Sequence, residues 1–267
     1  MSPRQTCMQC LQRDPPALLE AALWIAAEHD DQFQPAQVLA ELHGLLMQVS
    51  AGLPALPARE LAQPLLRRLA ELDFQEDDEG VTRPYHSLLH EVLRRRRGQP
   101  LALAIIALEL ARRLDIPLQG VNFPGHFLLR VPGADHLLDP CGGRRLYTPD
   151  CREQLYRQLG PGVELSAVHL QTADARDMLR RLSRNLRLLH MQHDNPMAAL
   201  KDAERVLLLG PANLVDHLAR ADVYRNLDCP QGERYDVEHA LLFCDDPSLR
   251  LELSQRLRSL ARAPAMH

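Results

Sequence analysis

The segment RGQPLALAIIALELARRL, residues 97–114, decides how the rest of the chain is interpreted. Between Arg97 and Arg112 it contains a single charged residue, Glu109. An apolar run of this length is typical of a helix that is buried on all sides. Pro100 is compatible with the first turn of a helix, because an N–H there has no acceptor within the helix. The sequence therefore predicts a central buried helix over residues 100–114.

Three short apolar runs follow this helix, over residues 118–123, 126–131 and 136–139. Pro-Gly pairs separate them, as is typical of strands joined by tight turns. We expect a small antiparallel sheet packed near the central helix.

The turn at residues 132–135 sets a register for the last two strands. If Val131 faces His136, the constant sum of an antiparallel ladder pairs Leu128 with Asp139 and His126 with Cys141. His126 and Asp139 then lie diagonally on one face, within reach of a hydrogen bond between their side chains.

Apolar residues at helical spacing occupy both flanks of this region. On the N-terminal side, helices are expected at residues 17–28, 36–50, 60–72 and 87–95, with an acidic loop at 76–80. Beyond residue 171 they are expected at 174–193, 196–209, 214–227, 232–243 and 248–261. Asp194-Asn195-Pro196 recurs as Asp228-Cys229-Pro230, 34 residues later (230 − 196), which is the period of tetratricopeptide helix pairs.

Composition narrows the classes of function. The chain has 267 residues, of which 46% are hydrophobic and 25% are charged. Its formal net charge of −4 creates no overall field that would attract nucleic acid or an anionic membrane. No segment approaches 18 uninterrupted apolar residues, and residues 1–16 lack the apolar run of a secretory signal. The six cysteines are scattered rather than arranged as a disulfide framework. We expect a cytoplasmic protein with reduced thiols, no membrane association and no cofactor.

Several motifs together resemble one family. Arg97-Gly98-Gln99-Pro100-Leu101-Ala102-Leu103 is followed by Pro124-Gly125-His126-Phe127-Leu128-Leu129-Arg130 and by Leu138-Asp139-Pro140. Their order and spacing resemble the bacterial SirB family, in which a transglutaminase-like domain precedes tetratricopeptide-like repeats. The resemblance runs nearly end to end. It implies an α+β, cysteine-protease-like domain at residues 1–173 and an all-α helical domain at 174–267.

The resemblance also identifies a missing nucleophile. Active members of the wider superfamily begin the buried helix with a cysteine, whose thiolate the helix N-terminus favours, and complete a triad with His and Asp. In this sequence the cysteine position falls on Pro100, while His126 and Asp139 match the other two members. A base and its orienting carboxylate do not perform acyl transfer without a nucleophile. We therefore expect a pseudoenzyme that serves as an interaction or regulatory scaffold for a protein or peptide partner.

Cys141 leaves an alternative open. The predicted register places it opposite His126 and beside Asp139, which would suit a thiol-dependent hydrolase or acyltransferase. An incidental cysteine in a turn is the simpler interpretation, because the sequence shows no helix N-terminus or oxyanion hole beside it.

Other motifs have plainer interpretations. Cys7-Met8-Gln9-Cys10 has the spacing of zinc ligands but lacks a second pair, so no metal site is expected. The pairs His86/His90 and His190/His193 are interpreted as surface features. The run Arg94 to Arg97 is interpreted as a solvated helix end rather than a nucleic-acid site, since no aromatic residues interleave it.

Overall fold

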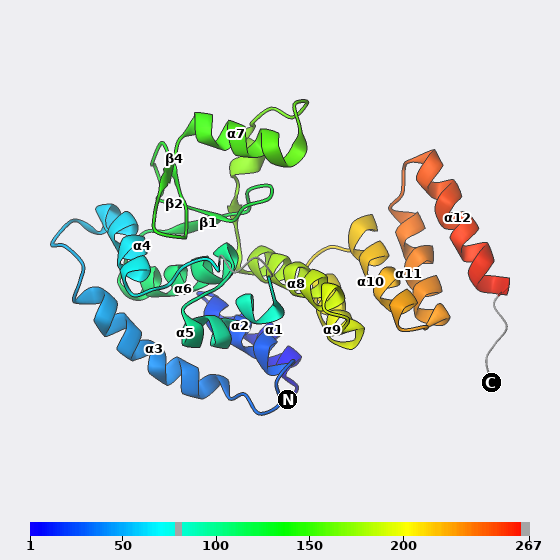
Figure 1. The fold of residues 1–267 in the computed structure, drawn as a ribbon, viewed down its shortest axis with the longest axis horizontal. Helices are drawn as coiled ribbons and strands as arrows, with labels where there is room; N and C mark the ends of the chain where they lie inside the picture. Colours follow the sequence, from blue (N-terminus) through cyan, green and yellow to red (C-terminus); the bar gives the residue numbers. More distant parts are fainter. Residues whose placement is uncertain (78–81, 263–267) are drawn as a thin grey trace. The chain divides into compact units, whose positions relative to one another are not determined.

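The structure is a computed structural model that describes residues 1–77 and 82–262, so part of the acidic loop predicted at 76–80 lies outside the described residues. The chain divides into two compact units, Met1–Leu182 and Ser183–His267. The first combines helices with a small sheet, and the second is helical (Figure 1). The α+β class with an all-helical C-terminal region is confirmed. The predicted domain boundary at residue 174 lies one residue before a helix that begins at Ala175, and as a statement about domains it stays a prediction.

Seven α-helices belong to the described part of the first unit. They are α1 (Pro3–Cys10), α2 (Leu18–Ala27), α3 (Pro35–Ser50), α4 (Ala62–Glu71), α5 (Leu89–Arg95), α6 (Pro100–Arg113) and α7 (Thr148–Leu159). Helix α6 is the predicted central helix, and nine of its residues are buried. The predictions for α2 to α6 are confirmed to within a few residues, whereas α1 and α7 were not predicted. Short 3-10 turns, η1 (Ala58–Glu60), η2 (Pro84–His86) and η3 (Ala167–Leu170), join some of these elements.

The sheet consists of five strands within the described residues, in the order β4-β3-β2-β1-β5, all antiparallel. Their bounds are β1 (Gln119–Val121), β2 (Leu128–Arg130), β3 (Leu137–Leu138), β4 (Arg145–Leu146) and β5 (Thr172–Ala173). Leu129 pairs with Leu138. The residue numbers of that pair have the same sum as those of Val131 and His136, so the predicted register is confirmed. Strands β4 and β5 were not predicted.

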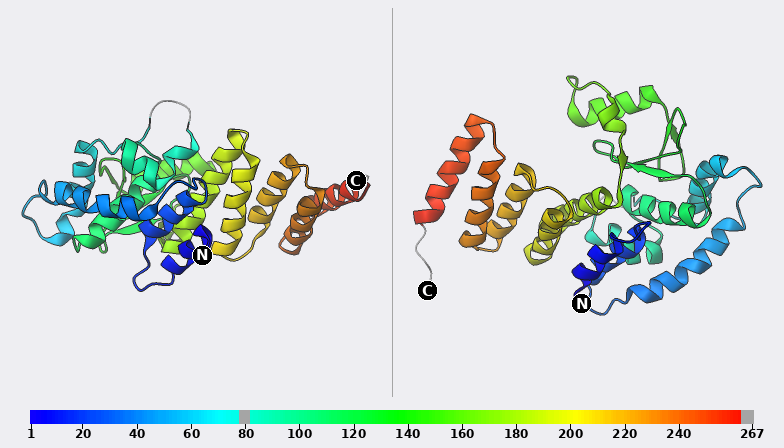
Figure 2. Two further views of the ribbon diagram at one scale, coloured as in Figure 1. Left: turned by 90° about the horizontal axis from the view of Figure 1, so that it is seen from below. Right: turned by 180° about the vertical axis from the view of Figure 1, so that it is seen from behind.

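The sheet lies between α6 and α7, as Figure 1 and the right-hand view of Figure 2 show. Leu128 and Leu137 cluster with Cys151 and Leu155 of α7, which identifies the face that α7 covers. Because side chains alternate along a strand, Leu129 belongs to the opposite face, toward α6. Burial on both faces explains why β2 begins with consecutive apolar residues.

Helix α3 touches the rest of the first unit along a narrow seam. Its buried residues are Pro35, Leu42 and Val49, one every seven positions. Two helical turns separate successive members, so most of the helix surface is free of packed neighbours. This seam leaves room for a cleft on one side of α3, described below.

The second unit contains helix pairs with the predicted period. Helix α8 (Ala175–Gln192) enters it from the first unit, and α9 (Pro196–Leu209), α10 (Leu214–Asn226), α11 (Pro230–Leu242) and α12 (Pro247–Arg262) follow. Both α9 and α11 begin at the two prolines of the predicted repeat, and Asp194 and Asp228, which precede them at equivalent positions, both adopt positive φ. Helices α10, α11 and α12 lie side by side (Figure 2). The 34-residue repeat of the sequence therefore corresponds to a repeat of helices in the structure.

Each helix pair encloses a buried aspartate at the same repeat position. Asp202 on α9 accepts from Arg205 at 2.7 Å and lies 2.8 Å from Nδ1 of His190. Asp236, at the equivalent position on α11, accepts two hydrogen bonds of 2.8 Å from Arg220 and lies 2.8 Å from Nδ1 of His217. Buried carboxylates persist only when cations and hydrogen bonds compensate their lost hydration, and both clusters meet that condition.

Within the part of the chain that the structure describes, each helix falls short of the length or the apolarity that crossing a bilayer requires.

Candidate functional site

Pro100 occupies the first helical position of α6, and Gln99 precedes it as the N-cap in an extended conformation. The backbone N–H of Gln99 donates to the carbonyl of His86 at 2.7 Å, and its side-chain oxygen accepts from the hydroxyl of Ser87. These bonds fix the entry of the chain into the helix. At the position where the resemblance expects a nucleophile, the helix therefore presents only a saturated ring.

His126 lies in the turn before β2. Gly125 adopts a φ of 72°, and the backbone N–H of His126 donates to the carbonyl of Phe123 at 3.2 Å. The ladder of β2 begins only at Leu128, and His126 is exposed. Among the described residues it makes no side-chain hydrogen bond or ion pair with Asp139. The structure thus leaves the two matched triad members unconnected.

The carboxylate of Asp139 stabilises its own turn. Its side chain accepts from the backbone N–H of Cys141 at 2.8 Å, and its carbonyl accepts from the N–H of Gly143 at 3.0 Å. Burial and the nearby Asp139 carboxylate raise the pKa of the half-buried Cys141 thiol. A nucleophilic cysteine needs the opposite shift, because the thiolate is the reactive form. The surroundings of Cys141 therefore work against its use as a nucleophile.

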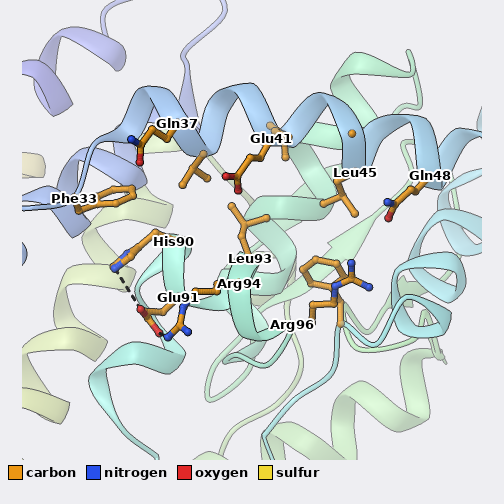
Figure 3. Close-up of a pocket in the computed structure, with 14 residues that line it drawn as sticks. Phe33, Gln37, Glu41, Leu45, Gln48, His90, Glu91, Leu93, Arg94 and Arg96 are labelled. Carbon is orange, nitrogen blue, oxygen red and sulfur yellow. Dashed lines mark hydrogen bonds and ion pairs between the residues drawn. The ribbon is translucent and has the colours of Figure 1, made fainter.

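A cleft that was not predicted opens between α3 and α5, with a volume of about 420 Å³ (Figure 3). We refer to it as the α3–α5 cleft. Its apolar lining comes from Val38, Leu42, Leu45, Phe74 and Leu93. Polar side chains from both helices face it, among them Glu41 of α3 and His90 of α5. Such a mixture of apolar surface and a few polar groups is typical of small-molecule sites.

Comparison with known proteins now identifies the family. A profile described as the Transglutaminase-like superfamily matches residues 36–184, more than half of the chain. The chain belongs to the transglutaminase-like superfamily. It is similar to the UPF0162 protein PA3419 of Pseudomonas aeruginosa, with 60% identity over 98% of this chain and 97% of that protein. A UPF0162 protein of Xylella fastidiosa is 39% identical over 64% of this chain and 63% of its own length.

Protein SirB1 of Salmonella typhimurium is 28% identical over 78% of this chain and 82% of that protein. The predicted membership in the SirB family is thereby confirmed. The matched profile includes α6, the sheet and α7, so the transglutaminase-like region contains Pro100, His126 and Asp139.

For two histidines of this transglutaminase-like protein, His86 and His190, the prediction of a surface position was wrong. His86 is 3% exposed, accepts at Nδ1 from the N–H of Arg83 at 3.0 Å and contacts the Asp77 carboxylate through Nε2. His190 is buried against Asp202 in the second unit. Spacing along a helix does not reveal which histidines have a carboxylate from another segment beside them.

The arginine run at the end of α5 is engaged locally. Arg94 and Arg95 both bond to Glu91 within the helix. Arg96 donates to the carbonyl of Leu72 at 2.8 Å, and Arg97 donates to Asp73 at 2.9 Å. Arg94, Arg95 and Arg97 thus contact carboxylates, and Arg96 contacts a backbone carbonyl. These local contacts agree with the interpretation of the arginine run as a helix end.

Cys7 and Cys10 are fully buried on α1. Burial raises the pKa of the Cys10 thiol to about 11, so this thiol is protonated at neutral pH. Both side chains contribute to the packed interior of the first unit.

Proposed function

We propose that this protein acts by binding a protein or peptide partner, without catalysing acyl transfer, and that it does so in the cytoplasm. The observation that carries the proposal is Pro100 at the start of α6, where active relatives in the superfamily need a nucleophile. His126 and Asp139 make no hydrogen bond or ion pair with each other in the described part of the chain, which supports the same proposal. Acyl transfer requires nucleophile, base and orienting group together.

The second unit supports the binding part of the proposal. It exposes large apolar side chains from several helices, including Val215 at 70% on α10 and Leu242 at 77% on α11. Exposed apolar groups gain free energy when a partner removes them from water. Stacked helix pairs are well suited to binding a protein or peptide, because they present an extended surface.

A mass-spectrometric experiment tests the absence of catalysis. The intact protein is incubated with a glutamine-containing peptide and with a peptide thioester, and its mass is then measured under denaturing conditions. We expect no covalent acyl adduct. An adduct lost in Cys141→Ser and in His126→Ala would establish the competing thiol-dependent enzyme instead.

A second experiment tests the binding surface. Partners are captured from extract of the source cells with the wild-type protein and with two variants, Val215→Glu and Leu242→Glu. Loss of the same partner in either variant would support recognition by the repeats. Full retention in both, with unchanged circular dichroism, would refute a role for these helices in binding.

A further inference from the structure

Another pocket, with a volume of about 350 Å³, lies between the start of α4 and the edge strand β4. We refer to it as the α4–β4 pocket. Its lining comes from η1 and α4, from the turn between β2 and β3, and from β3 and β4. The side chain of Gln63 on α4 donates to the carbonyl of Gly143 at 2.8 Å, and this bond connects α4 to the turn that precedes β4.

Three arginines line this pocket, and each comes from a different element. Arg59 belongs to η1, Arg67 to α4 and Arg145 to β4. All three are exposed, and their side chains make no ion pair or hydrogen bond within residues 1–77 and 82–262. The arginines of α5, in contrast, pair with a carboxylate of their own helix. The positive charge of the pocket is therefore accessible to a ligand and not already compensated.

The carboxylates at the pocket do not balance this charge. Among the described residues that line it, Glu60 supplies the one carboxylate, so the three arginines leave a formal charge of +2 (3 − 1). His136 also lines the pocket, and its Nδ1 lies 2.9 Å from the exposed carboxylate of Asp135. This hydrogen bond lowers the pKa of Asp135, and Arg145 adds a smaller effect of the same sign. Asp135 does not line the pocket, and counting it as well still leaves a positive charge.

The remaining lining adds a helix end and apolar surface. Ala62 and Gln63 of the first turn of α4 line the pocket, and the described structure shows no side-chain hydrogen bond that caps this helix. The N-terminal end of a helix carries a partial positive charge, which has the same sign as the arginines. Leu56, Pro64 and Val131 provide apolar surface that can remove part of a ligand from water.

We infer that the α4–β4 pocket binds a small organic oxyanion, a phosphate monoester or a carboxylate attached to a compact apolar body. Arginine donates two parallel N–H groups to such an oxyanion, and an alcohol or an amine does not offer matching acceptors. The charge of the lining favours a dianion over a monoanion. The volume lies within the range of roughly 300–1,000 Å³ that is usual for small-molecule sites. The inference is independent of the partner surface proposed for the second unit.

Four probes with the same aromatic body test this inference on the full-length protein: benzyl phosphate, phenylacetate, benzyl alcohol and benzylamine. Affinities are measured by ligand-observed NMR titration at about 0.15 M salt, where charges beyond about 8 Å are largely screened. Because the arginines are exposed, we expect benzyl phosphate to bind only about threefold more tightly than phenylacetate and about tenfold more tightly than benzyl alcohol. Benzylamine should bind most weakly. Benzyl alcohol or benzylamine binding as tightly as both anions would overturn the inference.

Substitutions of arginine locate the site. Arg67→Gln and Arg145→Gln each remove one lining charge, so each should weaken benzyl phosphate about threefold and the double variant about tenfold. Arg144→Gln is the matched control, because Arg144 is also exposed and precedes Arg145 but does not line the pocket. It should leave the affinity nearly unchanged. Equal binding by the wild type and the double variant, or an equal loss in Arg144→Gln and Arg145→Gln, would exclude the pocket as the site.

Substitution of the lining carboxylate tests the sign of the charge effect. Glu60→Gln removes the one negative charge among the described lining residues, so benzyl phosphate should bind about twofold more tightly and benzyl alcohol with unchanged affinity. Weaker binding of benzyl phosphate to this variant would refute an electrostatic preference for anions. The substituted side chains are all exposed, and circular dichroism of each variant verifies that it is folded.

Discussion

Replacing Asp236 by alanine should strongly destabilise the second unit. The carboxylate is fully buried and accepts two hydrogen bonds from Arg220, whose side chain is 15% exposed, while His217 contacts it at 2.8 Å. Removing one partner of a buried ion pair leaves an uncompensated charge and costs about 3–5 kcal/mol. Glu238, on the same helix, pairs with Arg234 at the surface, so Glu238→Ala should cost less than about 1 kcal/mol.

Urea unfolding followed by circular dichroism measures both variants. With a slope of about 1–3 kcal/mol per molar urea, Asp236→Ala should lower the midpoint of the helical transition by about 2 M. Combining Asp236→Leu with His217→Leu and Arg220→Met should recover most of that loss, because apolar residues of similar volume need no compensation. The reasoning is refuted if Asp236→Ala shifts the midpoint no further than Glu238→Ala does.

The remaining predictions concern glycines and thiols. Gly44→Ala should raise the free energy of unfolding by about 0.5–1 kcal/mol, because the added methyl group meets no atom and alanine favours the helix, as thermal unfolding would show. Gly232→Ala should instead lower it by about 1–3 kcal/mol, since its Cβ would approach the Tyr224 ring to 2.6 Å; an increase would show that the ring moves aside. Cys141 should be alkylated by iodoacetamide more slowly than the other half-buried cysteine, Cys229, because burial and the Asp139 carboxylate raise the pKa of the Cys141 thiol. Its rate should keep rising as the pH is increased above 9, and equal rates for the two thiols at pH 8 would contradict this.

The sequence predicted the elements whose apolar patterns are long or repeated. Helix α6 and the period of the C-terminal pairs were evident for that reason, and the register of β2 and β3 followed from a single turn. Helix α7 was missed because only Cys151 and Leu155 of its twelve residues are buried, which is too few to show a helical period. Strands β4 and β5 have two residues each and cannot display alternation.

The candidate site was only partly predictable. The proline at residue 100, where the resemblance expects a nucleophile, is visible in the sequence because it depends on residue identity at one position. The burial of His86, His90 and His190 depends on which other segments approach them. The α3–α5 cleft depends on the narrow seam of α3, and the spacing of Pro35, Leu42 and Val49 becomes meaningful only when the neighbouring residues are known to be exposed.

The ring of Pro100 removes more than a side-chain nucleophile from the start of α6. Proline also lacks a backbone N–H, so this helix end has one donor fewer with which to hold an oxyanion. A cysteine introduced elsewhere along α6 would supply sulfur but not that donor. Among positions along α6, only a change at residue 100 would therefore supply a side-chain nucleophile and a backbone N–H donor at the same place.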